Sequence, residues 1–295
     1  MIDAVVSYLY RRAKLTKPIW LGLGVHDIDH SPTEFPEVTI IIPTRDRIDL
    51  LRPCLESIQT LTNYPTYRIL VLDNDSKAPE SFEFFSAIES ESLTVIPAPG
   101  EFNYSEIMNR GVDASTSELV CLLNNDTVIQ SANWLTEMVA HLAEPKVGLV
   151  GALLLYPNGS IQHAGIALGF KGLAGHIYAG HQPSNSTPAF EHCYAVSAAT
   201  FACALTSRKL WHQLNGLDTN FKVGLNDVDF GMRASYLGYD SVVCTHARLI
   251  HLESESRKSM KTFKGFARAV SEILWFSHKH PKGKLVDPYF KFDTE

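Results

Sequence analysis

The stretch that decides the fold is Val38-Thr39-Ile40-Ile41-Ile42, which ends at Pro43 and the polar run Thr44-Arg45-Asp46-Arg47. A continuous β-branched run of this kind is typical of a strand buried on both faces, as in a parallel sheet. The apolar residues that follow are spaced for one face of a helix: Ile48, Leu51, Leu55, Ile58 and Leu61. This opening predicts a strand followed by a helix.

The alternation of strand and helix continues to about residue 150. We expect further strands at residues 68–72, 93–96, 118–123 and 147–150, and helices at 81–88, 103–114 and 132–143. Strands that alternate with helices predict a doubly wound α/β fold, with a Rossmann-like, mostly parallel central sheet and helices on both faces.

The pattern changes after residue 156. Residues 157–200 are rich in Gly, His, Ser and Ala and show weak periodicity. Helices are expected at 206–214 and 227–237, strand-like pieces at 240–244 and 248–252, and a basic amphipathic helix at 259–278. The chain therefore divides into a lead-in (1–36, with an amphipathic stretch up to about Lys14 and then a loop), a main domain (37–257) and a helical tail (258–295).

The composition is that of a globular protein with an ordinary core. Of the 295 residues 45% are hydrophobic and 20% charged, and the formal net charge is −6. No run of lysine or arginine exceeds two residues. A nucleic-acid-binding surface needs a basic patch, so nucleic acid is not expected as a partner.

The cysteines and the lengths of the apolar runs indicate in which cellular compartment the protein is expected. The five cysteines form no C-x-x-C or zinc-ligand spacing and mostly have apolar neighbours, which predicts buried free thiols in a reducing compartment. Val5 to Tyr10 is too short and wrongly flanked for a secretory signal, and Val147 to Tyr156 is too short for a membrane span. We therefore expect a cytoplasmic enzyme.

Three polar clusters follow predicted strands: Thr44 to Arg47, Asp73-Asn74-Asp75 and Asn124-Asn125-Asp126. Ligands of open α/β sheets bind outside the carboxyl ends of the strands. Turn chemistry would explain one acidic turn, but three at one rim favour a bound ligand. The chain has no G-x-G-x-x-G and no P-loop motif, so a diphosphate here would need a divalent cation. Asp126, after a buried strand, suits Mg²⁺ or Mn²⁺.

A fourth acidic cluster, Asn226-Asp227-Val228-Asp229, opens a predicted helix. Asp229 and Arg233 are spaced i, i+4, which predicts a structural ion pair. Asp227 lies at the helix start, where the helix dipole favours an ionised carboxylate. A role as helix N-cap is the alternative for Asp227.

In this order the motifs resemble those of the family-2 inverting glycosyltransferases of GT-A fold, especially the bacterial branch that builds O-antigen and related surface polysaccharides. The resemblance runs from residue 37 to 257 and closes with His251 to Arg257. The segments that carry it are Val38–Arg47, Leu72–Ser76, Glu101–Ser105 with Asn109, Leu123–Thr127, Gln162–Gly165, Gly216–Asp218, Asn226–Arg233 and His251–Arg257. Two segments depart from the family: the metal motif is Asn-Asn-Asp, and Asn226 precedes Asp227 where many relatives have Glu.

The resemblance implies a site and a reaction. Residues 37–155 would bind the nucleotide sugar and residues 156–257 would carry the acceptor and catalytic side. Asp227 would act as the base, and Asp126 with His251 would hold Mn²⁺ or Mg²⁺. The implied nucleotide-sugar contacts are Pro43, Thr44, Arg45, Asp73, Asn109, Asn125 and Arg257; the implied acceptor or donor-sugar contacts are Gln162, His163 and Asn226.

The resemblance also implies the partners. The donor would be a UDP- or dTDP-sugar such as a galactose, glucose or rhamnose donor, and the acceptor a glycan or a lipid-linked oligosaccharide. The enzyme would then be a hexosyltransferase of polysaccharide biosynthesis. The basic helix at 259–278 would either dock onto the catalytic domain or contact the inner face of the cell membrane.

Two rival functions would need other sequence features. A nucleotidyltransferase would need a glycine-rich, lysine-containing loop after the first strand, and Thr44 to Arg47 contains no glycine. A catalytically silent carbohydrate-binding or scaffold protein would be favoured by the loss of Asp126 or Asp227, and both are present.

Overall fold

The computed structural model describes residues 15–20, 23–24, 26, 32, 34–170, 173–183, 190, 192–252, 262–280 and 286–294. Arg257 and the expected amphipathic lead-in lie outside these residues. The domain boundaries at 36, 155 and 257 stay predictions.

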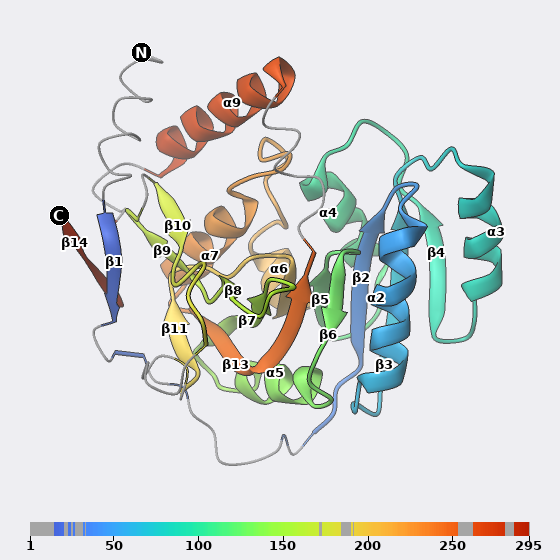
Figure 1. Ribbon diagram of the computed structural model, residues 1–295, viewed down its shortest axis with the longest axis horizontal. Helices are drawn as coiled ribbons and strands as arrows, with labels where there is room; N and C mark the ends of the chain where they lie inside the picture. The colour runs from blue at the N-terminus through green and yellow to red at the C-terminus, as the bar shows by residue number, and fades with distance from the viewer. Residues whose placement is uncertain are drawn as a thin grey trace.

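A ten-stranded sheet forms the centre of the described chain (Figure 1). The order of the eight strands along its main path is β11-β13-β7-β12-β5-β2-β3-β4. Their bounds are β2 (Val38–Thr44), β3 (Tyr67–Asp73), β4 (Leu93–Pro97), β5 (Leu119–Leu123), β7 (Val147–Leu155), β11 (Tyr194–Val196), β12 (Cys203–Ser207) and β13 (Asp240–His251). Parallel pairing joins β5, β2, β3 and β4, and also β7 and β13, as the apolar runs predicted.

Helices cover both faces of this sheet. The helices α2 (Ile48–Leu61), α3 (Pro79–Ile88) and α5 (Trp134–Leu142) pack into the core on one face. The helices α4 (Tyr104–Ala114), α6 (Arg208–Gln213) and α7 (Asn226–Tyr236) pack into the core on the other. The α/β fold with a central sheet between two helical layers is thereby confirmed.

The centre of the sheet contains a strand that the sequence did not predict. β12 lies antiparallel between β5 and β7, where we expected a helix to begin at residue 206. The strand is only five residues long, and α6 begins directly after it, with the Ser207 side chain accepting from Leu210 N at 3.1 Å. Such a short apolar run is ambiguous between strand and helix.

The region after residue 156 folds into short strands. These are β8 (Ile161–His163), β9 (Ile166–Leu168), β10 (Ala174–His176) and β11. β8 pairs with β7, and the short strand β6 (Thr127–Ile129) pairs with the end of β13. The two strand-like pieces expected at 240–252 are one strand, β13, whose register shifts between Cys244 and Arg248.

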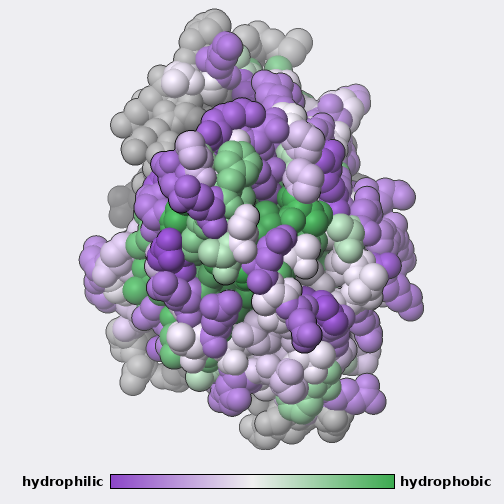
Figure 2. All heavy atoms as spheres, turned by 90° about the vertical axis from the view of Figure 1, so that its right-hand side faces the viewer, coloured by the Kyte–Doolittle hydropathy of each residue, from purple (hydrophilic) through white to green (hydrophobic). Residues whose placement is uncertain are grey.

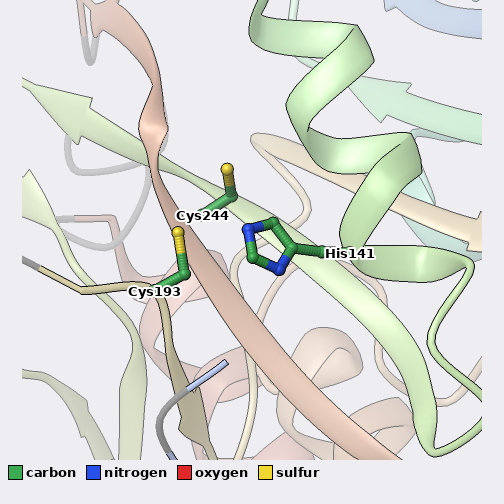
Figure 3. A group of neighbouring side chains, drawn as sticks. All are labelled: His141, Cys193 and Cys244. Atoms are coloured by element: carbon green, nitrogen blue, oxygen red, sulfur yellow. The ribbon is translucent and has the colours of Figure 1, made fainter. Parts of the chain in front are cut away.

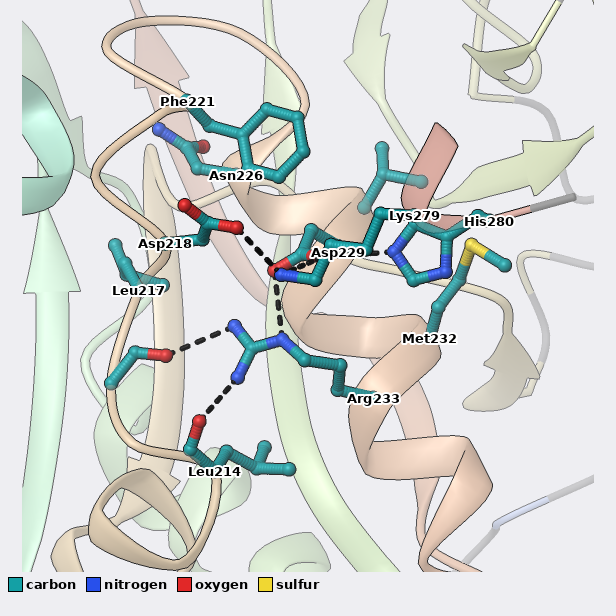
Figure 4. Close-up of polar contacts among 12 residues, drawn as sticks. Leu214, Leu217, Asp218, Phe221, Asn226, Asp229, Met232, Arg233, Lys279 and His280 are labelled. Carbon is teal, nitrogen blue, oxygen red and sulfur yellow. Dashed lines mark hydrogen bonds and ion pairs between the residues drawn. The ribbon is translucent and has the colours of Figure 1, made fainter. Parts of the chain in front are cut away.

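The C-terminal helix α9 (Phe263–Lys279) docks onto α7 and the loop before it (Figure 4). The fully buried Asp229 accepts from Arg233 Nε at 2.8 Å, and its other oxygen meets Lys279 Nζ at 2.8 Å and His280 Nε2 at 2.9 Å. The predicted ion pair and the docking alternative are both confirmed. Among the described residues no helix is long and apolar enough to cross a membrane. Membrane contact through α9 stays a prediction.

A second, two-stranded sheet lies at the edge of the molecule. β1 (Leu15–Trp20) pairs antiparallel with β14 (Phe290–Thr294), so segments from the two ends of the chain lie side by side (Figure 1). The expected loop at residues 15–20 is therefore wrong. Its sequence, LTKPIW, contains a proline and does not alternate, so no pattern indicated a strand.

Candidate active site

The ends of β2, β3 and β5 bring the predicted donor-side residues to one rim of the sheet. Thr44 and Asp73 are paired neighbours at the ends of β2 and β3. Asn125, after β5, donates from Nδ2 to Thr44 Oγ1 at 3.0 Å. Pro43 has no N–H to donate. Because β5 pairs only with residues 38–41 of β2, the β2–β5 ladder ends before Pro43 and loses no hydrogen bond to it.

Asp73 borders a shallow hollow between α3 and β4. The hollow is also lined by Phe82, Phe85, Ser86, Glu89, Val95 and Pro97. Figure 2 shows the side of the molecule that carries these elements, where apolar atoms lie among hydrophilic ones. Ser76 N donates to Asp73 Oδ1 at 3.0 Å, which fixes the turn. Arg45 is exposed at the same rim.

Asp46 has a structural role in this rim. It adopts a left-handed backbone with φ 49°, and its Oδ1 accepts from Lys77 N at 2.6 Å and from Ala78 N at 2.9 Å. The Ala78 and Lys77 hydrogen bonds keep the pKa of Asp46 below its usual value despite an opposing effect of burial. The carboxylate thus holds the loop after β2 against the loop after β3.

Asp126 and His251 meet at the end of β13. His251 Nε2 lies 3.1 Å from Asp126 Oδ1, and His251 Nδ1 lies 2.6 Å from Gln162 Oε1. Leu252 N also donates to the Asp126 carbonyl at 2.9 Å. Asp126 is 8% exposed. Three residues predicted from separate motifs are therefore in one contact group.

The hydrogen bond to Gln162 determines which nitrogen of His251 faces Asp126. An amide oxygen only accepts, so Nδ1 of His251 carries the proton that it donates to Gln162. Nε2 of the neutral ring is then a lone pair that points at a carboxylate oxygen. A cation bound by both atoms would remove the repulsion between these two acceptors, which lie 3.1 Å apart.

Asp227 lies in the first turn of α7. Burial raises the pKa of Asp227 to about 6, although N–H groups of Val228 and Asp227 and the hydroxyl of Thr200 oppose the shift. Leu225, directly before the helix, adopts a left-handed backbone with φ 63°. The buried Asn226 accepts from Asp227 N at 2.8 Å, so its side chain helps to set the helix start. Asp227 is not the N-cap, a position that Leu225 occupies.

Thr200, which the sequence did not single out, joins Asp227 to the predicted site residue His163. Thr200 N donates to His163 Nε2 at 3.3 Å, and the Thr200 hydroxyl bonds to Asp227. His163 Nδ1 must therefore carry the proton and donate to His176 Nδ1, 2.9 Å away. Burial, with the rings of His176 and His251, lowers the pKa of His163 well below its usual value, so the ring is neutral.

Tyr104 and Thr200 interact with Asp227 but were not among the predicted site residues. Tyr104 donates to the Phe201 carbonyl at 3.0 Å, and the charge of Asp227 adds to burial in raising the Tyr104 pKa. Both residues reach the site through the loop at 199–202, which is tied to the donor side by Asn124 N donating to Ala202 O at 3.0 Å.

Asn109 is engaged elsewhere. Its Nδ2 donates to Leu217 O at 2.9 Å, and its Oδ1 accepts from Leu217 N at 2.8 Å. Both ends of the amide thus join α4 to the loop after α6.

The chain belongs to glycosyl transferase family 2, whose model matches residues 39–214. The O-antigen biosynthesis protein RfbC of Myxococcus xanthus is 34% identical in an alignment of 265 residues that covers 86% of this chain and 20% of that protein. The uncharacterized protein y4gI of Sinorhizobium fredii (strain NBRC 101917 / NGR234) is 36% identical over 263 residues, 86% of this chain and 29% of that protein. The chain thus spans less than a third of the length of these curated relatives.

Solved structures share the fold. The mannosyltransferase PcManGT from Pyrobaculum calidifontis, in complex with GDP-Man and Mn²⁺, superposes with a TM-score of 0.59 at 20% identity, over 91% of this chain and 72% of that one. GalNAc-T7 with UDP, GalNAc and Mn²⁺ superposes with a TM-score of 0.62 at 12% identity, over 84% of this chain and 57% of that one. The GT-A fold expected from the sequence is confirmed.

Proposed function

We propose that this chain is an inverting, metal-dependent glycosyltransferase that moves a hexosyl or deoxyhexosyl residue from a nucleotide-diphosphate sugar to a glycan or lipid-linked acceptor in bacterial surface-polysaccharide synthesis. The observation that carries the proposal is the pair Asp126 Oδ1 and His251 Nε2, 3.1 Å apart at the rim of the sheet. Family membership and the name of the Myxococcus relative support the reaction class and the pathway.

The Asp126–His251 pair fits Mn²⁺ or Mg²⁺. Ligand atoms about 2.1 Å from an octahedral ion lie about 3 Å apart when they are neighbours. The observed separation of 3.1 Å matches that spacing, and Gln162 orients the ring as an outer partner of a metal-bound histidine does. A divalent ion bound here would offset the charge that develops on the leaving diphosphate.

The donor side would use the rim residues of the first half. Thr44, Arg45 and Asp73 would contact the base and ribose, with Pro43 and Asn125 shaping the same rim. Arg257, outside the described residues, would offset phosphate charge. Asn109 is left out, because both ends of its amide hold Leu217. A UDP- or dTDP-sugar remains our first expectation, and the Mn²⁺ named with both structural neighbours supports a metal-bound nucleotide.

Asp227 would act as the base. The acceptor hydroxyl gives its proton to the Asp227 carboxylate while its oxygen forms a bond to the anomeric carbon. The bond from that carbon to the diphosphate oxygen breaks, and the nucleoside diphosphate leaves with the electron pair. A pKa of about 6 keeps Asp227 ionised at neutral pH and close to the range in which a base is most effective. Gln162, His163 and Asn226 would shape the space for the transferred sugar or the acceptor.

Thermal shift with UDP, dTDP and GDP, each with and without Mn²⁺, tests the nucleotide and metal part of the proposal. A stabilisation of about 2.7 kcal/mol is expected when the nucleotide is 100-fold above its dissociation constant, and only with metal present. Indifference to every nucleotide would favour the silent carbohydrate-binding or scaffold alternative. Product analysis with matched nucleotide sugars and a lipid-linked glycan then identifies the sugar and the linkage.

A further inference from the structure

A second group of metal-ligating side chains lies apart from the proposed active site (Figure 3). His141 comes from the last turn of α5, Cys193 lies just before β11, and Cys244 lies within β13. All three are buried, and one ligand atom from each lies within 4.8 Å of the others. The thiols of Cys193 and Cys244 are not joined in a disulfide.

The imidazole of His141 is the feature that calls for a ligand. The residue is 1% exposed, and neither ring nitrogen has a hydrogen-bond partner among the described residues. A buried polar group without a partner costs about 1–3 kcal/mol, so native structures rarely leave one in this state. A cation bound to one ring nitrogen would remove much of this free-energy cost.

A fourth ligand is within reach at the surface of the cluster. His246 Nδ1 lies 3.9 Å from Cys193 Sγ, and Glu137 Oε2 lies 3.8 Å from the same nitrogen. His246 is two residues after Cys244, at the register shift of β13.

We propose that His141, Cys193, Cys244 and His246 form a structural Zn²⁺ site. Two thiolates and two imidazoles are a common tetrahedral zinc set, with Zn–S near 2.3 Å and Zn–N near 2.0–2.1 Å. Such bond lengths place neighbouring ligand atoms about 3.3–3.8 Å apart. The ligand atoms of His141, Cys193 and Cys244, within 4.8 Å of one another, need to close by about 1 Å to reach this spacing. His246, whose side chain is 54% exposed, would complete the set by turning toward the ion.

The site would act on the fold and not on the transfer reaction. Cys193 and Cys244 belong to the core on the α5 face of the sheet, whereas His251 lies seven residues further along β13, at its rim end. Bound zinc would tie α5, β13 and the segment before β11 together. The ligands are soft sulfur and imidazole groups, which favour zinc over the Mn²⁺ or Mg²⁺ of an oxygen-rich site.

Metal analysis of the purified, tag-free chain tests this proposal. We expect about one zinc per chain by mass spectrometry of the metals. Replacement by Co²⁺ should give the absorption of tetrahedral cobalt together with a thiolate-to-cobalt charge-transfer band. Both readouts use the unaltered protein, so they do not depend on whether a variant folds.

Variants locate the site. His141→Ala and Cys244→Ala should each lower the zinc content at least tenfold, while Cys121→Ala, at a buried cysteine of β5 outside the cluster, should keep it. Asp126→Ala should also keep the zinc, which separates this site from the proposed catalytic metal. Absence of zinc together with no cobalt charge-transfer band, or a Cys193–Cys244 disulfide in the freshly purified protein, would overturn the proposal.

Discussion

The two halves of the main domain build their parts of the site in different ways. In residues 38–129 the side chains at the rim follow directly from strand ends, as with Thr44 and Asp73, which are neighbours in register. In residues 156–251 they come from short strands, a loop and a helix start that meet only in three dimensions. Gln162 reaches His251 across 89 residues of sequence.

In the first half, the sheet topology alone positions the side chains at the ends of the parallel strands. In the second half, contacts between distant segments position the side chains of the site. A side chain at the end of a strand is in position as soon as the sheet has formed. Asp227 needs the left-handed Leu225, the Asn226 side chain and Thr200 as well. Substitutions in the second half should therefore reveal more about mechanism than those in the first.

The largest expected effect comes from the base. Asp227→Asn should lower turnover about 10²–10⁴-fold, because the amide cannot accept the acceptor proton. Turnover is measured as release of the nucleoside diphosphate, and nucleotide binding should persist. Asp113→Asn, at an exposed position of α4, is the matched control. An unchanged rate in Asp227→Asn would remove Asp227 from this role.

The next effect is on stability and concerns the tail. Asp229→Ala should lower the free energy of unfolding by about 3–5 kcal/mol, because it leaves Arg233, Lys279 and His280 without their buried partner. Burial alone would raise the pKa of Asp229, but the bond from His280 and the charges of Arg233 and Lys279 bring it below its usual value.

The sign of the pH dependence follows from that lowered pKa. The stabilisation by Asp229 is present above the unfolded-state pKa of about 3.9 and is lost as the pH falls through the folded-state value. Denaturant unfolding at pH 7 and at pH 3 should therefore show a smaller deficit of Asp229→Ala in acid. An equal deficit at both values would contradict the ion-pair explanation.

A smaller effect should follow from removing the Gln162 side chain, which bonds to His251 of the Asp126–His251 pair. Gln162→Ala should weaken Mn²⁺ binding about 10–100-fold, since His251 loses the group that orients its ring. The readout is the Mn²⁺ concentration that gives half of the nucleotide-dependent thermal shift. Gln130→Ala, at an exposed glutamine of the first half, should leave this concentration unchanged.

The pH–rate profile should report the same base. Asp227 must be ionised to act, so turnover should fall about tenfold per pH unit below its pKa of about 6. Because this pKa is raised in the folded state, the ionised carboxylate opposes folding above that pH. Asp227→Asn should accordingly melt at a higher temperature than the unaltered protein at pH 8, and the gain should shrink toward pH 4.5.

The smallest effect is expected at the exposed face of α9. Phe266 is 53% exposed and Trp275 38%, yet Lys279 at the basic end of the helix is held by Asp218 and Asp229. Phe266→Ala should change the free energy of unfolding by less than about 0.5 kcal/mol. Co-sedimentation with anionic vesicles should show no binding for either form. Binding by the unaltered protein that Phe266→Ala loses would instead establish the membrane contact.

The sequence predicted the parts of this structure that local patterns encode. The apolar runs located β2, β3, β5 and the start of β7, and the helical spacing located α2, α4 and α7. β12 was missed because its five residues, Cys203 to Ser207, are too few to show a period of their own next to a helix. The ordered motifs predicted that Asp126, Gln162 and His251 belong to one site.

Other parts could not be predicted, because they depend on contacts between distant segments. Thr200 and Tyr104 join the site through a hydroxyl and a carbonyl contact that leave no pattern in the chain. The group of His141, Cys193 and Cys244 was hidden for the same reason. Its members are about fifty residues apart, so no zinc-ligand spacing exists to be found.

The pairing of β1 with β14 has a consequence for how this unit can be connected to others. Segments from both ends of the described chain lie side by side at one edge of the molecule. Units whose entry and exit points are adjacent can be inserted into a longer polypeptide with little disturbance to either neighbour. The β1–β14 pair gives the described chain adjacent first and last strands, which is the arrangement that such an insertion needs.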